Sequence, residues 1–288
     1  MADTRPGREH FEQTPAPFGA RALTVQVGPI AVRFEGLDGG LFEESGTRYG
    51  PFLSEAAPLH RVSVHPGDPA YLDKAPDGYL RLEEVDAEGW KRLYSHDFAA
   101  QRRGGEGRLR IAPSSDREAP VRALENYLRW VVADLALDRG GFVLHGAGLV
   151  RDGSAHLFFG PSGAGKSTVT GLSEGCAILS DDLVLLLRGD SGWRAATTPF
   201  AGTFPQGAKE RRDFPLKGLY RLIQSPEDRL EPLAPGLAVG KVLSCCPFVG
   251  DPAARRDRLM PLVEACCRAV PPVDLHFRKS PDFWRLIA

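Results

Sequence analysis

The stretch Gly160-Pro161-Ser162-Gly163-Ala164-Gly165-Lys166-Ser167-Thr168 fits the phosphate-binding loop (P-loop) pattern of a glycine, four residues, and then Gly-Lys-Ser/Thr. Glycines let backbone N–H groups point at phosphate oxygens, because they carry no Cβ. In this pattern the side chain of Lys166 reaches the β- and γ-phosphates, and the hydroxyl of Ser167 holds Mg²⁺. We therefore predict a site for ATP and Mg²⁺. The predicted nucleotide contacts are Gly160, Ser162, Gly163, Ala164, Gly165, Lys166, Ser167 and Thr168.

The residues on either side of this stretch suit such a loop. Residues 155–159 (Ala-His-Leu-Phe-Phe) predict a short buried strand that runs into it. Residues 166–173 predict a helix, with Gly175 at the position of a C-cap glycine. An ordinary glycine-rich turn is the alternative interpretation, and the strand-loop-helix order favours the phosphate site.

The composition is typical of a soluble globular protein. The 288 residues are 42% hydrophobic and 25% charged, with a net charge of −1, and they suffice for one large or two modest domains. Such a balanced charge creates no overall field toward nucleic acid or an anionic membrane. Residues 1–13 lack the apolar segment of a secretory signal, and no apolar run approaches the ~20 residues of a membrane helix. We expect a cytoplasmic protein without nucleic-acid or membrane partners, and the sequence leaves open whether it forms a homo-oligomer.

The five cysteines are Cys176 and two adjacent pairs, Cys245-Cys246 and Cys266-Cys267. An odd number without a signal peptide argues against a disulfide framework. Adjacent cysteines also lack the usual CxxC spacing of zinc sites. We therefore predict buried structural thiols rather than a zinc site.

The first part of the chain predicts a loose tail over residues 1–20, followed by a β-rich domain over residues 21–118. Alternating apolar residues at 23, 25 and 27 and then at 30, 32 and 34 flank Gly28-Pro29, which predicts a hairpin. Further strands are predicted at 59–64, 79–85 and 108–111.

The second part, residues 119–288, predicts an α/β domain. Apolar residues from Val121 to Leu135 recur at helical spacing, and Gly140-Gly141 ends that helix. The other predicted elements are strands at 142–145, 148–150, 177–180, 183–187, 193–197 and 273–277, and helices at 236–246 and 252–269.

Two adjacent aspartates follow the predicted strand at 177–180. Asp181 and Asp182 come only fifteen residues after Lys166. One carboxylate is suited to hold Mg²⁺, and the other to accept the proton of an attacking hydroxyl. We favour Asp181 as the base and Asp182 as the metal contact. A pair of aspartates that only makes a turn is the alternative.

Two further side chains are candidates for the same site. His145 ends a predicted strand next to the one that enters the loop, although a lone histidine beside an apolar strand is often structural. Phosphoryl transfer also needs positive charge on the γ-phosphate beyond lysine and Mg²⁺. Arg211, in the run 209–212 after a predicted loop at 198–207, is the candidate, and a solvated charged loop is the alternative.

The order of His145-Gly146, a strand, the loop, a short helix and Asp181-Asp182 resembles the C-terminal catalytic domain of bacterial HPr kinase/phosphorylases. It looks most similar to HPr kinase-like proteins of peptide-modification gene clusters, including lasso-peptide precursor kinases. Residues 214–222 and 275–284 also look like those relatives, so the resemblance covers residues 144–288. It implies an α/β P-loop nucleotide-binding domain of the HPr kinase/PEP carboxykinase type, with a small β-rich N-terminal domain that can dock a substrate.

The resemblance implies an ATP·Mg-dependent kinase that phosphorylates a serine hydroxyl on a peptide or protein. It makes Lys166 a catalytic residue and places His145 near the transferred phosphate. Thr168 stands where HPr kinases have glutamate, and their downstream Arg-Gly-x-Gly signature is missing from this sequence. These departures favour a flexible peptide over folded HPr as the acceptor. A kinase of small-molecule hydroxyls and a non-catalytic nucleotide-binding module are the alternatives.

Overall fold

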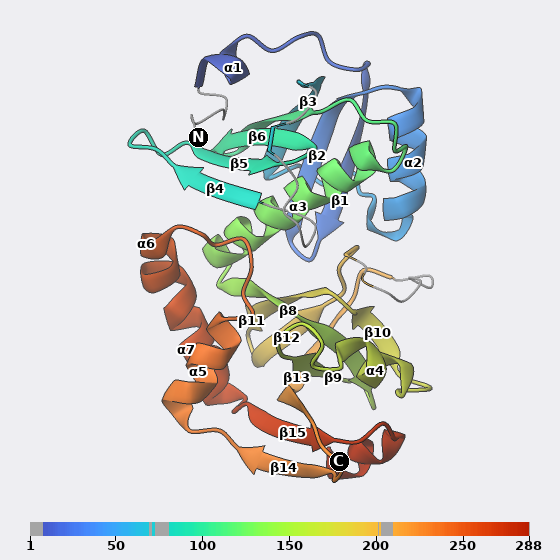
Figure 1. Ribbon diagram of the computed structural model, residues 1–288, viewed down its shortest axis with the longest axis vertical. Helices are drawn as coiled ribbons and strands as arrows, with labels where there is room; N and C mark the ends of the chain where they lie inside the picture. The colour runs from blue at the N-terminus through green and yellow to red at the C-terminus, as the bar shows by residue number, and fades with distance from the viewer. Residues whose placement is uncertain (1–7, 69–70, 73–80, 201, 203–209, 288) are drawn as a thin grey trace. The chain divides into compact units, whose positions relative to one another are not determined.

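The computed structural model of the protein describes residues 8–68, 71–72, 81–200, 202 and 210–287. The chain divides into two compact units, Met1–Val131 and Val132–Ala288. The division falls within helix α3 (Ala119–Asp138), which confirms the long helix predicted from the apolar spacing. The fold is mixed α/β, and each unit contains one mixed β-sheet (Figure 1).

The first unit is built on a seven-stranded sheet with the order β1-β2-β3-β7-β6-β5-β4. Its strands are β1 (Arg21–Val27), β2 (Ile30–Leu37), β3 (His60–Pro66), β4 (Arg81–Val85), β5 (Lys91–Ser95), β6 (Phe98–Arg103) and β7 (Glu106–Ile111). The predicted hairpin is confirmed, because β1 and β2 pair antiparallel with Val27 opposite Ile30. Strands β5 and β6 were not predicted, since charged and small residues obscure their alternation.

Helices complete the first unit. Helix α2 (Gly39–Tyr49) was not predicted, because it opens on two glycines; the side chain of Asp38 caps it by accepting the N–H of Leu41 at 2.8 Å. A short 3₁₀ turn, η1 (Gly50–Phe52), follows it. From α3, Tyr127 and Trp130 are fully buried, and the Tyr127 hydroxyl bonds to Nε2 of His60 at 2.7 Å.

The segment predicted as a loose tail includes residues 1–7, which lie outside the described residues. The following residues contain helix α1 (Arg8–Glu12), whose Phe11 side chain is fully buried. Backbone carbonyls of this segment accept hydrogen bonds from two strands: that of His10 from Arg110 on β7, and that of Pro15 from His65 on β3, both at 2.8 Å.

The second unit contains an eight-stranded sheet with the order β10-β8-β11-β12-β13-β15-β14, in which β9 pairs with both β8 and β13. Its strands are β8 (Gly141–Arg151), β9 (Ser154–Phe159), β10 (Ala177–Ser180), β11 (Leu183–Gly189), β12 (Gly192–Ala196), β13 (Asp213–Gln224), β14 (Arg229–Pro232) and β15 (Val273–Phe277). Strands β9, β13 and β15 are parallel to one another.

The second unit differs from the prediction at several points, among them β8, β13 and helix α4 (Lys166–Gly171). The strands predicted at 142–145 and 148–150 are one continuous strand, β8, because Gly146 stays in the ladder opposite Phe159. Strand β13 was not predicted, since Pro215, Lys217 and Gly218 interrupt its apolar pattern. Helix α4 is shorter than predicted and ends at a Leu172 cap rather than at Gly175.

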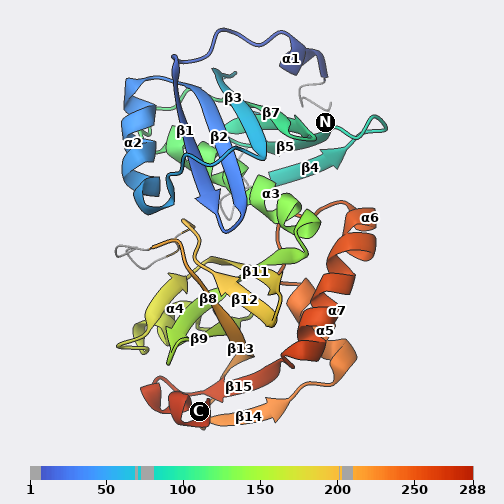
Figure 2. The same cartoon turned by 180° about the vertical axis from the view of Figure 1, so that it is seen from behind.

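Helices cover the second sheet on two sides. Helices α5 (Pro235–Leu243) and α7 (Met260–Ala269) lie side by side (Figure 2) and contribute to one core cluster. Helix α6 (Pro252–Ala254) and the π-helical turn η2 (Arg255–Leu259) lead into α7, where a single helix was predicted. Cys246, Cys266 and Cys267 are buried in this cluster as predicted for structural thiols, whereas Cys176 and Cys245 are partly exposed.

A second core cluster is aromatic and supports α4. The ring of Phe158 stacks on Tyr220 at 5.2 Å and meets Trp284 edge-on at 5.6 Å. Trp284 belongs to the C-terminal 3₁₀ helix η3 (Pro281–Leu286), and its Nε1 donates to the Ser173 hydroxyl at 2.9 Å.

We predict that Phe158→Ala lowers the free energy of unfolding by about 3–5 kcal/mol, because it removes the fully buried centre of the aromatic cluster and leaves a cavity. Leu237→Ala is the matched control, since Leu237 is 50% exposed on α5 and its truncation is expected to cost less than about 0.5 kcal/mol. Urea denaturation followed by circular dichroism measures both. Equal losses in the two variants would contradict this account of the core.

Candidate functional site

Residues 160–165 connect the end of β9 to the start of α4, so the predicted strand, loop and helix follow one another. Gly163 and Gly165 adopt φ angles of 78° and 109°, a region that favours glycine. Gly165 is restricted by space as well, because a Cβ there would lie 2.6 Å from Cζ of Phe277. This glycine-rich loop therefore rests directly on the end of β15. The side chain of Gln224, at the end of β13, donates to the carbonyl of Gly163 at 2.7 Å.

Lys166 is the first residue of α4, and its side chain folds back over the loop. Its Nζ donates to the carbonyl oxygens of Gly160 at 3.1 Å and Pro161 at 3.2 Å. Burial lowers the pKa of Lys166, while the nearby Cys245 and Asp182 act in the opposite direction. The amine is thus held among loop carbonyls with a carboxylate within electrostatic reach.

The other predicted contacts of the loop differ in their accessibility. Ser162, Gly163 and Ser167 are exposed, so their polar groups are open to a ligand. Thr168 is half-buried on the first turn of α4. Ala164 packs against the aromatic cluster, and only its backbone can serve a ligand.

The two aspartates lie where the partners of β8 change. Strand β10 pairs with Gly148–Val150 and β11 with Gly141–His145, so the turn between them lies opposite the middle of β8. The N–H of Gly146 donates to the backbone carbonyl of Asp182 at 2.9 Å. The aspartate turn is therefore fixed to the strand that also pairs with β9.

Asp182 and His145 face each other across this junction. The distance from Nε2 of His145 to Oδ1 of Asp182 is 3.6 Å, and the side chains are 44% and 18% exposed. Because Lys166 interacts electrostatically with Asp182, the structure brings together His145, Lys166 and Asp182 out of the predicted catalytic residues.

Asp181 faces a different neighbour. Its side chain is buried, and Oδ1 accepts the backbone N–H of Gly202 at 2.8 Å. Adjacent side chains of an extended chain point to opposite sides, and here one carboxylate meets His145 while the other meets Gly202. The two predicted carboxylates are thus separated by direction although they are adjacent in sequence.

Arg211 lies at the exit of the segment that joins β12 to β13, and it is exposed. Its neighbour Arg212 donates its backbone N–H to the Thr197 hydroxyl at 3.0 Å, and the Arg212 guanidinium lies 5.8 Å from the ring of Phe214. Most of the loop predicted at 198–207 lies outside the described residues, as does Lys209.

Cys245 is the residue of this region that the sequence analysis missed. It follows the C-terminus of α5, where its carbonyl accepts the N–H of His145 at 2.7 Å and its partly exposed thiol influences Lys166. Nothing in the local pattern marks it, because its position depends on how α5 packs against β8.

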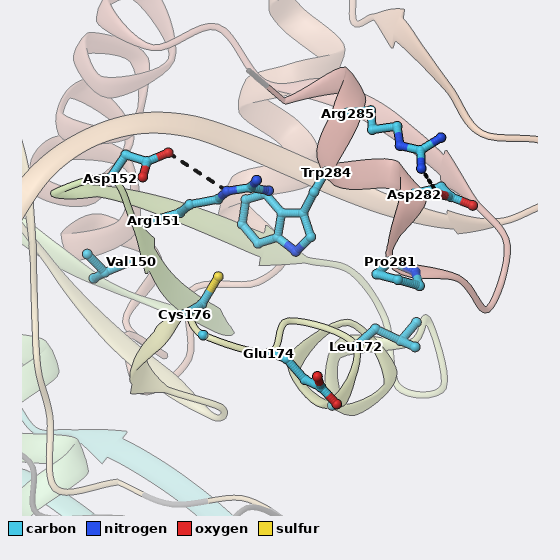
Figure 3. Close-up of a pocket in the computed structure, with 12 residues that line it drawn as sticks. Val150, Arg151, Asp152, Leu172, Glu174, Cys176, Pro281, Asp282, Trp284 and Arg285 are labelled. Carbon is cyan, nitrogen blue, oxygen red and sulfur yellow. Dashed lines mark ion pairs between the residues drawn. The ribbon is translucent and has the colours of Figure 1, made fainter.

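A cavity of about 720 Å³ lies at the other end of α4 (Figure 3). The guanidinium of Arg151 covers the ring of Trp284 there at 5.0 Å. Burial raises the pKa of the Cys176 thiol on the same wall, which keeps it protonated at neutral pH. Carboxylates and guanidiniums both line the cavity, and none of its lining residues belongs to the predicted site.

Within the described residues, no helix has both the length and the apolar character needed to cross a membrane.

Comparison with known proteins gives one family match. The model of the family described as SynChlorMet cassette protein ScmC matches residues 109–248, just under half of the chain. The matched span contains every predicted site residue, from His145 to Arg211, and also Cys245. No curated protein matches the chain.

We predict that iodoacetamide modifies Cys245 at least about tenfold faster than Cys246 or Cys266, because the thiolate must be both formed and accessible. Burial raises the pKa of Cys246 and Cys266 far above the ordinary value, whereas Cys245 is partly exposed. Tandem mass spectrometry of timed samples distinguishes the adjacent positions, and Cys245→Ser should remove the fast phase. Fast labelling of Cys246 would contradict the placement of α5.

Proposed function

We propose that this protein is a kinase that transfers the γ-phosphoryl group of ATP, with Mg²⁺, to a serine hydroxyl of a peptide or protein. The observation that carries the proposal is the position of Asp182, which lies 3.6 Å from His145 and within electrostatic reach of Lys166 beside the glycine-rich loop. Binding a nucleotide alone needs a loop and a cation. A carboxylate and an imidazole facing the same point are what a transfer to a hydroxyl adds.

The residues of the loop fit a magnesium nucleotide. Gly163 and Gly165 have no Cβ to keep a phosphate from their backbone N–H groups, and Lys166 supplies a positive charge within the loop. In this proposal the exposed Ser167 hydroxyl and the Asp182 carboxylate would hold Mg²⁺, since oxygen ligands suit this ion. The bound metal would neutralise charge on the phosphates.

The proposed reaction is a displacement at the γ-phosphorus. The acceptor oxygen forms a bond to phosphorus as the bond from phosphorus to the β–γ bridging oxygen breaks, and ADP leaves. The hydroxyl proton passes to an aspartate of the 181–182 pair. His145 lies beside Asp182 and would contact the transferred phosphoryl group. Arg211 is the proposed additional cation, and the nucleotide-binding domain is proposed to be of the HPr kinase/PEP carboxykinase type.

Two observations support a peptide acceptor. Thr168 stands where HPr kinases have glutamate, which argues against HPr as the acceptor. The matching family is described as a cassette protein, so proteins encoded beside this one are the candidates to test.

The first unit offers sheet edges to which a peptide could add as a further strand. Part of the β1 edge is already taken, because Leu53 bridges Val25 and the N–H of Ser54 bonds to the Thr24 carbonyl at 3.1 Å. Strand β4 forms the opposite edge of that sheet.

We predict that Lys166→Ala weakens binding of Mg·ATP and lowers kcat by at least about 10²-fold, because the charge that meets the phosphates is lost. The fold should survive, since the hydrogen bonds of this side chain to described residues are to loop carbonyls. Lys217→Ala, an exposed lysine on β13, is the control for a loss of one positive charge. Calorimetric titration with Mg·ATP measures affinity, and unchanged affinity in folded Lys166→Ala would remove the phosphate site from the proposal.

We predict that full-length protein with Mg·ATP adds a phosphoryl group to a serine of a flexible peptide encoded beside its gene, and does so faster than to folded HPr. The full chain is required, because a cut after residue 118 would strip the sheet from the buried Tyr127 and Trp130 of α3. Intact-mass and fragment mass spectrometry locate the phosphate, with a Ser→Ala peptide as control. Labelling of HPr alone would overturn the peptide acceptor. Labelling of small hydroxyl compounds alone would identify a small-molecule kinase.

A further inference from the structure

We propose that Asp181 is a positioning residue, whose carboxylate anchors the chain after β12 to the β10–β11 turn and thereby aims Asp182 at the reacting groups. This reverses the preference for Asp181 as the base, and it rests on the proposed kinase function. Asp182 is then the carboxylate of the pair that accepts the proton of the acceptor hydroxyl, beside the metal that it and Ser167 would hold.

The carboxylate of Asp181 is already engaged inside the protein. The residue is 6% exposed, and its Oδ1 accepts the N–H of Gly202 at 2.8 Å. Glycine at position 202 lies close against this aspartate, because a Cβ there would lie 2.9 Å from Oδ2 and 3.2 Å from both Cγ and the backbone oxygen of Asp181, so the carboxylate would have to shift. To reach a hydroxyl bound at the loop, this carboxylate would have to give up its hydrogen bond to the N–H of Gly202 and leave its buried position.

Other buried hydrogen bonds join the same two segments. The Ser180 hydroxyl donates to the carbonyl of Phe200 at 2.8 Å and accepts the N–H of Asp182 at 3.1 Å. The Thr198 hydroxyl donates to the carbonyl of Leu183. Ser180 and Thr198 are fully buried. We call residues 180–183 with residues 198–200 and Gly202 the clasp. A buried network of this kind favours one arrangement of its backbone.

The side chain of Asp182 points away from Gly202, toward His145. Its side chain is partly exposed, lies 3.6 Å from His145 and interacts with Lys166. Its backbone is held on both flanks, since its N–H bonds to Ser180 within the clasp and its carbonyl accepts the N–H of Gly146 on β8. The direction of the Asp182 carboxylate therefore depends on the turn that Asp181 ties down.

The Asp181→Asn variant distinguishes a positioning role of this residue from a role as base or metal ligand. Its amide oxygen can still accept the N–H of Gly202, but it is neither a base nor an anionic metal ligand. We expect Asp181→Asn to keep kcat within about threefold, and Asp181→Ala and Gly202→Ala to lower it by roughly 10–100-fold with little change in the KM for ATP. Asp182→Asn should lower kcat by about 10²–10⁴-fold, since it alters the carboxylate that acts directly.

A second measurement reports on the clasp without any catalytic activity. Arg211 and Arg212 are exposed beyond the clasp on the way to β13, and both are trypsin sites. We expect faster cleavage there in Asp181→Ala and Gly202→Ala, and a wild-type rate in Asp181→Asn. Cleavage after the exposed Arg256 provides the internal reference.

The outcomes distinguish this inference from the proposed function. If Asp181→Asn loses as much kcat as Asp181→Ala while trypsin cleavage is unchanged in all variants, Asp181 acts on the reactants and the inference is wrong. If no acceptor is phosphorylated, the proposed function fails, and the cleavage rates still decide the clasp. Should Asp181→Ala not fold, Gly202→Ala carries the same comparison, because its Cβ would displace the carboxylate from the other side.

Discussion

The second unit depends above all on β8, a strand whose two sides are paired by different neighbours along its length. Residues 146–151 pair with β9, and residues 141–145 pair with β11. Successive backbone groups of a strand point in opposite directions. The N–H of His145 therefore reaches the carbonyl of Cys245, whereas that of Gly146 reaches Asp182. Strand β8 therefore contacts three parts of the site. It pairs with β9, which leads into the glycine-rich loop, and its residues 145 and 146 bond to Cys245 after α5 and to Asp182 in the aspartate turn.

The charged side chains of Lys166 and Asp182 beside the glycine-rich loop are partly buried. Burial works against the positive charge of Lys166, and the carbonyls of Gly160 and Pro161 together with Asp182 support it. Beneath the loop, Phe277 leaves room only for a glycine at 165. Aromatic packing below and hydrogen-bonded strands beside the loop hold the polar groups in place, which the proposed phosphoryl transfer would require.

The adjacent residues Asp181 and Asp182 have different surroundings. Asp181 is directed into the protein, toward Gly202, and Asp182 toward His145 and the loop. The buried hydroxyls of Ser180 and Thr198 strengthen that division, because each bonds across to the other segment. In the proposed kinase, the inner aspartate shapes the turn and the outer one meets the reactants. The cavity beside Trp284 lies at the opposite end of α4 and takes no part in this arrangement.

The sequence alone determined the features whose signal is local. Alternation and a glycine-proline break predicted the β1–β2 hairpin, helical spacing predicted α3, and the flanks of the glycine-rich loop predicted β9 and the start of α4. It also singled out His145 and Asp182, whose side chains lie 3.6 Å apart. The tertiary structure alone decided which aspartate faces His145, because that depends on Gly202 occupying the other side of the turn. Cys245 and β13 escaped prediction for a related reason: their places come from packing and strand register between distant segments, which no local pattern records.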